Sequence, residues 1–240
     1  MTMEPSLRLK DSIAPHLVSS LRRAIIATRL RPGEALSEKD IAGRFGVGRQ
    51  PVREAFIELS EAGLVQVLPS RGTYVMKVSM RAIANARFVR EAVECAIARA
   101  ASALITAKDV VRLRRLIERQ RETSGLADRS AFAVLDENFH QTLAEIVDCD
   151  YAARIVEGAR AQTDRVRYLS LPGASPVPLL VAQHAAIVDA IEAGDADGAE
   201  CEMRKHLREI LNALPRIAQN YPELFEDEVM PAHTQVLHRP

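Results

Sequence analysis

Apolar residues recur with the 3.6-residue period of an α-helix through nearly all of the chain beyond Met80, and no strand-like alternation of any length interrupts them. Helices are predicted over residues 80–103, 107–123, 129–147, 150–170, 177–193 and 196–213. Short connections between amphipathic helices favour antiparallel neighbours that bury their apolar faces together. This pattern therefore restricts most of the chain to an antiparallel, all-helical bundle.

The composition is that of a globular protein. The 240 residues are 48% apolar and 27% charged, and the three cysteines show no CxxC spacing. A chain of this length leans towards two domains. No apolar run reaches the roughly 18–20 residues of a membrane helix, and no apolar segment follows the N-terminal charges as in a signal peptide. We therefore expect a cytoplasmic protein without a membrane partner, a disulfide scaffold or a thiolate zinc site.

Charge is balanced over the whole chain but divided within it. Lysine plus arginine and aspartate plus glutamate each total 32. Residues 1–78 hold 12 basic and 8 acidic residues, a net charge of +4, and the remainder carries −4. This division suggests that the N-terminal part meets a polyanion.

Two helices are predicted at the start of the chain. The first runs from Ile13 to about Arg29. The second follows Ser37, which precedes Asp40 by three residues as in a capping box, and Gly46 is placed to end it. The second helix is short and leads at once into a third, as in a helix-turn-helix motif.

The third helix opens at Gly48 or Arg49 and ends at Gly63. Two strand-like runs follow, Leu64–Leu68 and Thr73–Val78, joined by a turn that contains proline and glycine. Helix, short helix, helix and hairpin is the order of a winged helix-turn-helix. We therefore predict a mostly α protein, with a winged helix-turn-helix domain before the helical bundle.

The leading end of the third helix is suited to reading DNA. Its apolar residues face inward, which leaves Arg49, Gln50 and Arg53 on the outward face. Arginine matches guanine O6 and N7, and glutamine matches adenine, when such a helix enters the major groove. Arg71 beside Gly72 at the hairpin tip suits a thin, positively charged finger on the minor groove.

The stretch RPGEALSEKDIAGRFGVGRQPVREAFIELSEAGLVQVLPSRGTYV (31–75) resembles the DNA-binding domain of the GntR family of bacterial transcription regulators. The resemblance implies that Arg49 and Arg53 contact bases or phosphates, that Arg44 contacts phosphate, and that Gly72 lets the wing approach the groove. Gly48 stands where the family most often has serine, and Gln50 where it often has threonine. Because Gln50 is a potential base reader, the operator sequence stays open.

Three histidines and one aspartate lie within predicted helices of the bundle. Asp136 and His140 are spaced i, i+4, so both face one side of one helix, while His184 and His206 come from two further helices. The core of a bundle can bring ligands from facing helices together. One carboxylate with three imidazoles suits Zn, Ni, Mn or Fe(II).

A second resemblance covers roughly residues 80–215. DENFHQTL (136–143), QHAAIVDAI (183–191) and MRKHLREI (203–210) look like the FCD effector-binding domain of the FadR subfamily, in its metal-containing branch. This resemblance implies Asp136, His140, His184 and His206 as ligands of a divalent metal. It also implies a small carboxylate effector, a sugar acid or a di- or tricarboxylate, held by arginines. Arg90, Arg165 and Arg167 are the candidates, since guanidinium binds carboxylate bidentately.

The combined hypothesis is a ligand-responsive regulator, with repression the commoner outcome, that binds a palindromic operator in double-stranded DNA as a homodimer. Its expected domains are a DNA-binding domain at 1–78, an effector-binding and dimerisation domain at 79–217, and a C-terminal tail at 218–240. Three alternatives differ in kind: a metal sensor, a purely structural metal site and, least favoured, a metal-dependent hydrolase.

Overall fold

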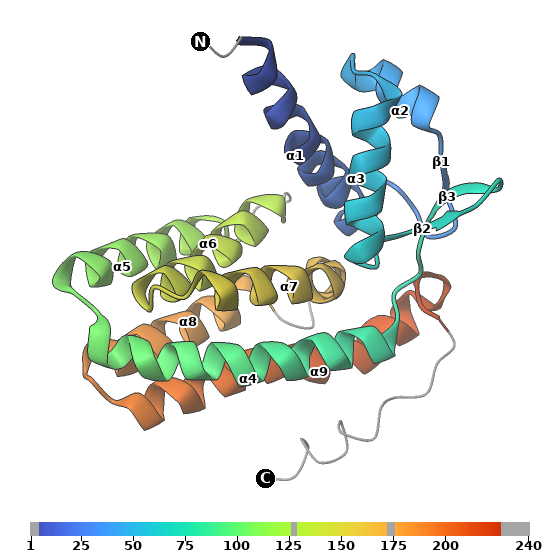
Figure 1. Cartoon of the computed structure of the whole chain (residues 1–240). Helices are drawn as coiled ribbons and strands as arrows, with labels where there is room; N and C mark the ends of the chain where they lie inside the picture. The colour runs from blue at the N-terminus through green and yellow to red at the C-terminus, as the bar shows by residue number, and fades with distance from the viewer. Residues whose placement is uncertain (1–4, 126–128, 172–175, 227–240) are drawn as a thin grey trace. The chain divides into compact units, whose positions relative to one another are not determined.

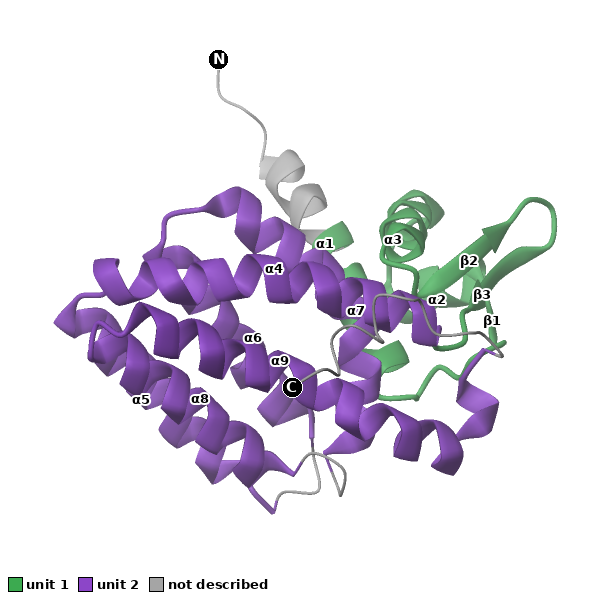
Figure 2. Cartoon of the chain, turned by 90° about the horizontal axis from the view of Figure 1, so that it is seen from below, with its two compact units in different colours: residues 1–78 green, residues 79–240 purple. Residues whose placement is uncertain are grey.

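The computed structural model describes residues 5–125, 129–171 and 176–226. The chain divides into two compact units, residues 1–78 and residues 79–240 (Figures 1 and 2). Both are built mainly from helices, and the described strands form one small antiparallel sheet in the first unit, which confirms the predicted fold class. Within the described residues, no helix combines the length and the apolar character needed to span a membrane.

In its described part, from residue 5 to 78, the first unit has three helices and a small sheet. Its elements are α1 (Pro5–Ile26), β1 (Ala35–Leu36), α2 (Glu38–Phe45), α3 (Arg49–Glu61), β2 (Val65–Leu68) and β3 (Gly72–Val75). The strands are antiparallel in the order β1-β3-β2, and Val65 lies opposite Val75 in the hairpin. The two-residue strand β1 is not predicted from the sequence, because it is too short to show any period.

The predicted limits of α2 are confirmed. Ser37 accepts a hydrogen bond from the backbone N–H of Asp40 at 3.3 Å, and Gly46 ends the helix with a φ of 65°. The inner face of α3 is buried, as its apolar spacing predicts. The first helix begins at Pro5 and ends at Ile26, earlier at both ends than predicted.

The second unit contains six helices and a short 3-10 turn among its described residues. They are α4 (Met80–Leu104), α5 (Ala107–Glu122), α6 (Ser130–Ile146), α7 (Asp150–Ser170), α8 (Val177–Glu192), α9 (Ala196–Asn220) and η1 (Pro222–Leu224). Helix α4 lies along α9, and α8 packs against α9 and α5 (Figure 1). The core is aliphatic, with Phe132 and Phe139 fully buried.

Helix α9 continues past residue 213, where the sequence pattern predicts its end. It runs through Pro215 to Asn220 because Leu214 and Ile217 extend its buried face. Phe225 is also buried, so the first residues of the expected tail belong to the folded unit. Residues 227–240 of that tail, and 172–175 of the predicted break before α8, lie outside the described residues.

Candidate metal centre and DNA-facing surface

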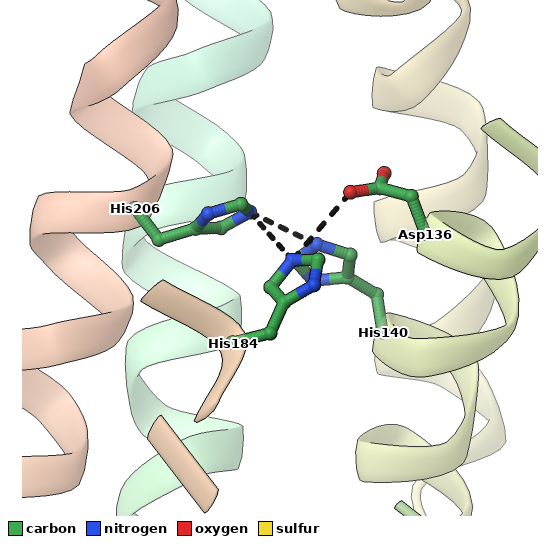
Figure 3. A group of neighbouring side chains, drawn as sticks. All are labelled: Asp136, His140, His184 and His206. Atoms are coloured by element: carbon green, nitrogen blue, oxygen red, sulfur yellow. Dashed lines mark hydrogen bonds and ion pairs between the residues drawn. The ribbon is translucent and has the colours of Figure 1, made fainter. Parts of the chain in front are cut away.

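Four side chains converge inside the bundle of the second unit. Asp136 and His140 come from successive turns of α6, His184 from α8 and His206 from α9 (Figure 3). One potential ligand atom from each lies within 4.8 Å of all the others. All four residues are at most 3% exposed. The set proposed from spacing and resemblance is therefore brought together in space.

A hydrogen-bond chain sets the orientation of His184. Gln120 on α5 donates through its Nε2 to the backbone oxygen of Leu135 at 3.1 Å, which fixes its Oε1 as the atom facing the imidazole. This oxygen only accepts, so Nδ1 of His184, 2.8 Å away, carries the proton. The Nε2 atom of His184 is therefore left with its lone pair towards the cluster.

The other two imidazoles also face a side-chain oxygen with Nδ1. Nδ1 of His206 lies 3.0 Å from Oε1 of Gln183, and Nδ1 of His140 pairs with Oε2 of Glu94. Nε2 of His206 lies 3.3 Å from Nε2 of both His184 and His140. Three nitrogen lone pairs thus face one another at short range, an arrangement that a cation stabilises and that outer hydrogen bonds of this kind prepare.

Asp136 completes a donor set that fits a divalent transition metal. Its Oδ1 is buried without a hydrogen-bond partner and lies 3.5 Å from Nε2 of His184. A buried carboxylate oxygen with no donor needs a cation or another partner. Three imidazole nitrogens and one carboxylate oxygen are ligands that Zn and its neighbours accept.

The protonation states suit the same use. Burial lowers the pKa of His184 to about 3 and also lowers the pKa values of His140 and His206, so the imidazoles are neutral. Burial opposes ionisation of Asp136, but the charges of Arg167 and Arg160 outweigh it and hold the pKa of this carboxyl well below its usual range. Neutral imidazole and ionised carboxylate are the forms that bind metal.

Arginines surround the centre. Arg90 donates from Nε to Glu94 at 2.6 Å and from Nη1 to Thr163 at 3.3 Å. Arg160 donates from Nη2 to Oδ2 of Asp136 at 2.7 Å. Nη2 of Arg90 and Nη1 of Arg160 are buried without a hydrogen-bond partner, whereas Nε of Arg160 lies 3.9 Å from Oδ1 of Asp164.

The proposed DNA-contacting residues all lie in the first unit and are exposed: Arg44, Arg49, Gln50, Arg53, Arg71 and Gly72. Arg49, Gln50 and Arg53 lie on the first two turns of α3. Tyr74 donates its hydroxyl to the backbone oxygen of Arg71 at 2.8 Å, which braces the turn of the hairpin. Gly72 has a φ of 108°, a conformation that favours glycine.

Comparison with known proteins decides the family. Residues 14–75 match the model of bacterial regulatory proteins of the gntR family, and residues 86–209 match the FCD domain. The chain is 41% identical to the HTH-type transcriptional repressor RspR of Escherichia coli K12, over 95% of this chain and 100% of that protein. The chain belongs to the GntR family. It is a transcriptional regulator and not an enzyme.

Solved structures have the same fold as this GntR-family regulator. The structure of E. coli McbR/YncC gives a TM-score of 0.74 at 18% identity, covering 88% of this chain and 99% of that one. A putative GntR regulator from Rhodococcus sp. RHA1 gives 0.69 at 25% identity, covering 84% and 97%.

The three arginines proposed for the effector differ in their surroundings. Arg90 joins the centre through Glu94, and the charge of Arg167 acts on Asp136. Arg165 is also buried, and burial lowers its pKa to about 10. The arginine charges that lower the pKa of Asp136 are those of Arg167 and Arg160.

Sequence reasoning missed Arg160, Gln120 and Gln183. Arg160 precedes Arg167 by two helical turns, so the i, i+7 spacing on α7 could have shown that both face the centre. The two glutamines carry no local signal. A cavity of about 100 Å³ between α6 and α7 is lined by His140, which belongs to the centre, and by Arg160, which binds Asp136.

Proposed function

We propose that this GntR-family protein is a ligand-responsive repressor that binds a two-fold operator as a homodimer and changes its DNA affinity when a small organic acid binds at a metal centre in the FCD domain. One observation carries the proposal: three imidazole nitrogens and an unpartnered carboxylate oxygen converge beside buried guanidinium groups that have unused donors. The sequence resemblance supports placement in the metal-containing branch of the FadR subfamily.

The N-terminal unit supplies the DNA contacts in this proposal. Arg49, Gln50 and Arg53 read base edges from the leading end of α3, where guanidinium and amide groups match guanine and adenine. Arg44 binds phosphate. Arg71 and Gly72 lay the hairpin tip on the minor groove. A DNA-bound regulator of this kind acts in the cytoplasm of a bacterium.

The C-terminal unit supplies the sensor. Asp136, His140, His184 and His206 would hold the metal, a Zn, Ni, Mn or Fe ion. A divalent cation there would provide open coordination positions for a carboxylate. The unused donors of Arg90 and Arg160 point to the anionic end of the ligand, since arginine forms strong paired hydrogen bonds to carboxylate. Arg167 contributes positive charge, and Arg165 stays a candidate from the sequence resemblance.

An effector that binds one arrangement of the helices more tightly than another changes the free energy of DNA binding. The coupling free energy between two such sites is typically about 1–3 kcal/mol. Repression is favoured because RspR, at 41% identity, bears the name of a transcriptional repressor. The effector class proposed is a sugar acid or a di- or tricarboxylate.

Two alternatives predict different responses. A metal sensor would change its DNA affinity with the free metal concentration and not with organic acids. If the metal site is purely structural, replacing one of the four metal-binding residues would destabilise the protein but leave its response to the effector unchanged.

The test is a gel-shift assay on DNA fragments from the genomic region around the gene, with a panel of sugar acids and dicarboxylates. Elemental analysis of the purified protein tests for the metal. The proposal expects bound metal, one acid that shifts the affinity, and loss of DNA binding in the double variant Arg49→Ala, Arg53→Ala. No shift with any acid would overturn the effector role, and full binding by the double variant would overturn the DNA-binding role.

A further inference from the structure

Arg53 of α3 is tied to a carboxylate from the preceding helix. Its Nε donates to both oxygens of Glu38, at 2.9 and 3.0 Å, and Glu38 is the first residue of α2. The side chains are 57% and 32% exposed, respectively. An ion pair this exposed contributes little to stability. Its main effect is to fix the position of the Arg53 guanidinium group.

The ion pair uses one edge of the guanidinium. Both hydrogen bonds come from Nε, so the terminal pair of nitrogens, Nη1 and Nη2, forms the edge that the Glu38 bonds leave for another partner. Reading guanine O6 and N7 takes two parallel N–H groups. An arginine already held at Nε gives up less side-chain freedom when that outer edge binds a base.

The charge of Glu38 has a second effect. A carboxylate beside Arg53 offsets one positive charge on the surface proposed to meet DNA, and it repels phosphate. Attraction to phosphate supplies most of the affinity for random DNA. Glu38 would therefore weaken binding to DNA of random sequence, while it holds Arg53 in position to contact a base.

We propose that Glu38 is a positioning residue that determines operator specificity, by holding Arg53 with its outer edge towards the DNA bases. This inference rests on the proposed DNA-binding function. Gln50 and Glu54 show a related arrangement on the same helix, since Nε2 of Gln50 donates to Oε1 of Glu54 at 3.0 Å.

The experiment uses the full chain and a library of random DNA duplexes. Sequences enriched by the wild type define a preferred site, and affinities for this site and for a scrambled duplex are then measured at several salt concentrations. The variants are Glu38→Ala, which removes both the acceptor and the charge, and Glu38→Gln, which keeps an acceptor oxygen. Glu61→Gln is the matched control, because it removes the same charge from the far end of α3. Thermal melts check that each variant is folded.

We expect Glu38→Ala to lower the ratio of specific to random affinity by about 5- to 100-fold and to relax the preference at one base position. Glu38→Gln should keep that preference, bind random DNA more tightly and steepen the salt dependence by about one unit. Glu61→Gln should keep the wild-type preference. A wild-type ratio and preference in folded Glu38→Ala would overturn the inference. Failure of the wild type to enrich any sequence would instead overturn the DNA-binding proposal beneath it.

Discussion

Arg160 holds Asp136 by one carboxylate oxygen and leaves the other facing the histidines. Its Nη2 donates to Oδ2 at 2.7 Å, while Oδ1 has no hydrogen-bond partner and lies 3.5 Å from Nε2 of His184. The residues come from different helices, α7 and α6, so this bond fixes which oxygen can serve as a ligand.

Replacement of this arginine should therefore weaken metal binding without removing a ligand. We expect Arg160→Met to lower the affinity for Zn or Ni by about 10- to 100-fold, as loss of an outer hydrogen bond does at other metal sites. Isothermal titration of metal-free protein measures this directly. Arg154→Met, on the exposed side of α7, is the control. Equal metal affinities in the two folded variants would count against a positioning role for Arg160.

Gln120 should matter for both metal affinity and stability. In Gln120→Leu, Nδ1 of His184 and the backbone oxygen of Leu135 both lose their buried partner. We expect the free energy of unfolding to fall by about 1–3 kcal/mol, and metal affinity to fall by at least about 10-fold. Urea denaturation and metal titration measure the two effects. Gln141→Leu, at an exposed position of α6, should change neither quantity.

Metal removal should destabilise the protein through mass action. A cation present at 100 times its dissociation constant adds about 2.7 kcal/mol to the free energy of unfolding. For a chain of this size, such a change shifts the melting temperature by roughly 5–10 °C. Melts with a chelator and with added metal should differ accordingly in the wild type. Asp136→Asn should respond much less. A wild-type melt indifferent to both reagents would rule out the proposed centre.

Glu91, which is 5% exposed, joins α4 to α9 through a network of ion pairs. It accepts from Arg204 at 2.7 Å and from Arg208 at 2.8 Å, and it also pairs with Arg87, which is 1% exposed. Burial opposes ionisation of Glu91, but hydrogen bonds from Arg208 and Arg204 and the charge of Arg87 outweigh it and lower its pKa. The folded-state pKa is below the unfolded one, so this stabilisation is present above about pH 4.3 and is lost as the pH falls through the folded-state value.

We therefore expect Glu91→Gln to reduce the free energy of unfolding by about 3 kcal/mol at pH 7, the low end for a broken buried pair, because Arg204 and Arg208 reach solvent. The difference from the wild type should narrow below about pH 4, when Glu91 becomes protonated. Urea denaturation at pH 7 and in acid tests both points. Glu145→Gln breaks an exposed pair with Arg112 and should have little effect. A difference that grows in acid would contradict this account.

Gly72 should be sensitive to substitution because its φ is 108°. An alanine there adopts a conformation that L-residues rarely take, so we expect Gly72→Ala to destabilise the first unit by about 1–3 kcal/mol and to weaken DNA binding through the displaced hairpin tip. Gly43→Ala is the control, since Gly43 lies in α2 with open space around it and alanine favours helix. Thermal melts should give a lower melting temperature for Gly72→Ala but not for Gly43→Ala. Gel shifts should show weaker DNA binding for Gly72→Ala but not for the control.

Local patterns determined most of the secondary structure. The ends of α2 follow from Ser37 and Gly46, and the limits of α4 to α8 agree with the predicted helices to within one or two residues. Periodicity and capping involve residues only a few positions apart, so the sequence alone contains them. The i, i+4 spacing of Asp136 and His140 likewise determined that they share one face of a helix.

Tertiary contacts decided the rest. Helix α9 passes through Pro215 because Leu214 and Ile217 are buried in the bundle, and β1 forms because β3 pairs with it. The outer partners of the centre, such as Gln120 and Arg160, lie far from its histidines in the sequence. Only packing of separate helices determines which donor meets which acceptor, since those distances depend on the whole core and not on local spacing.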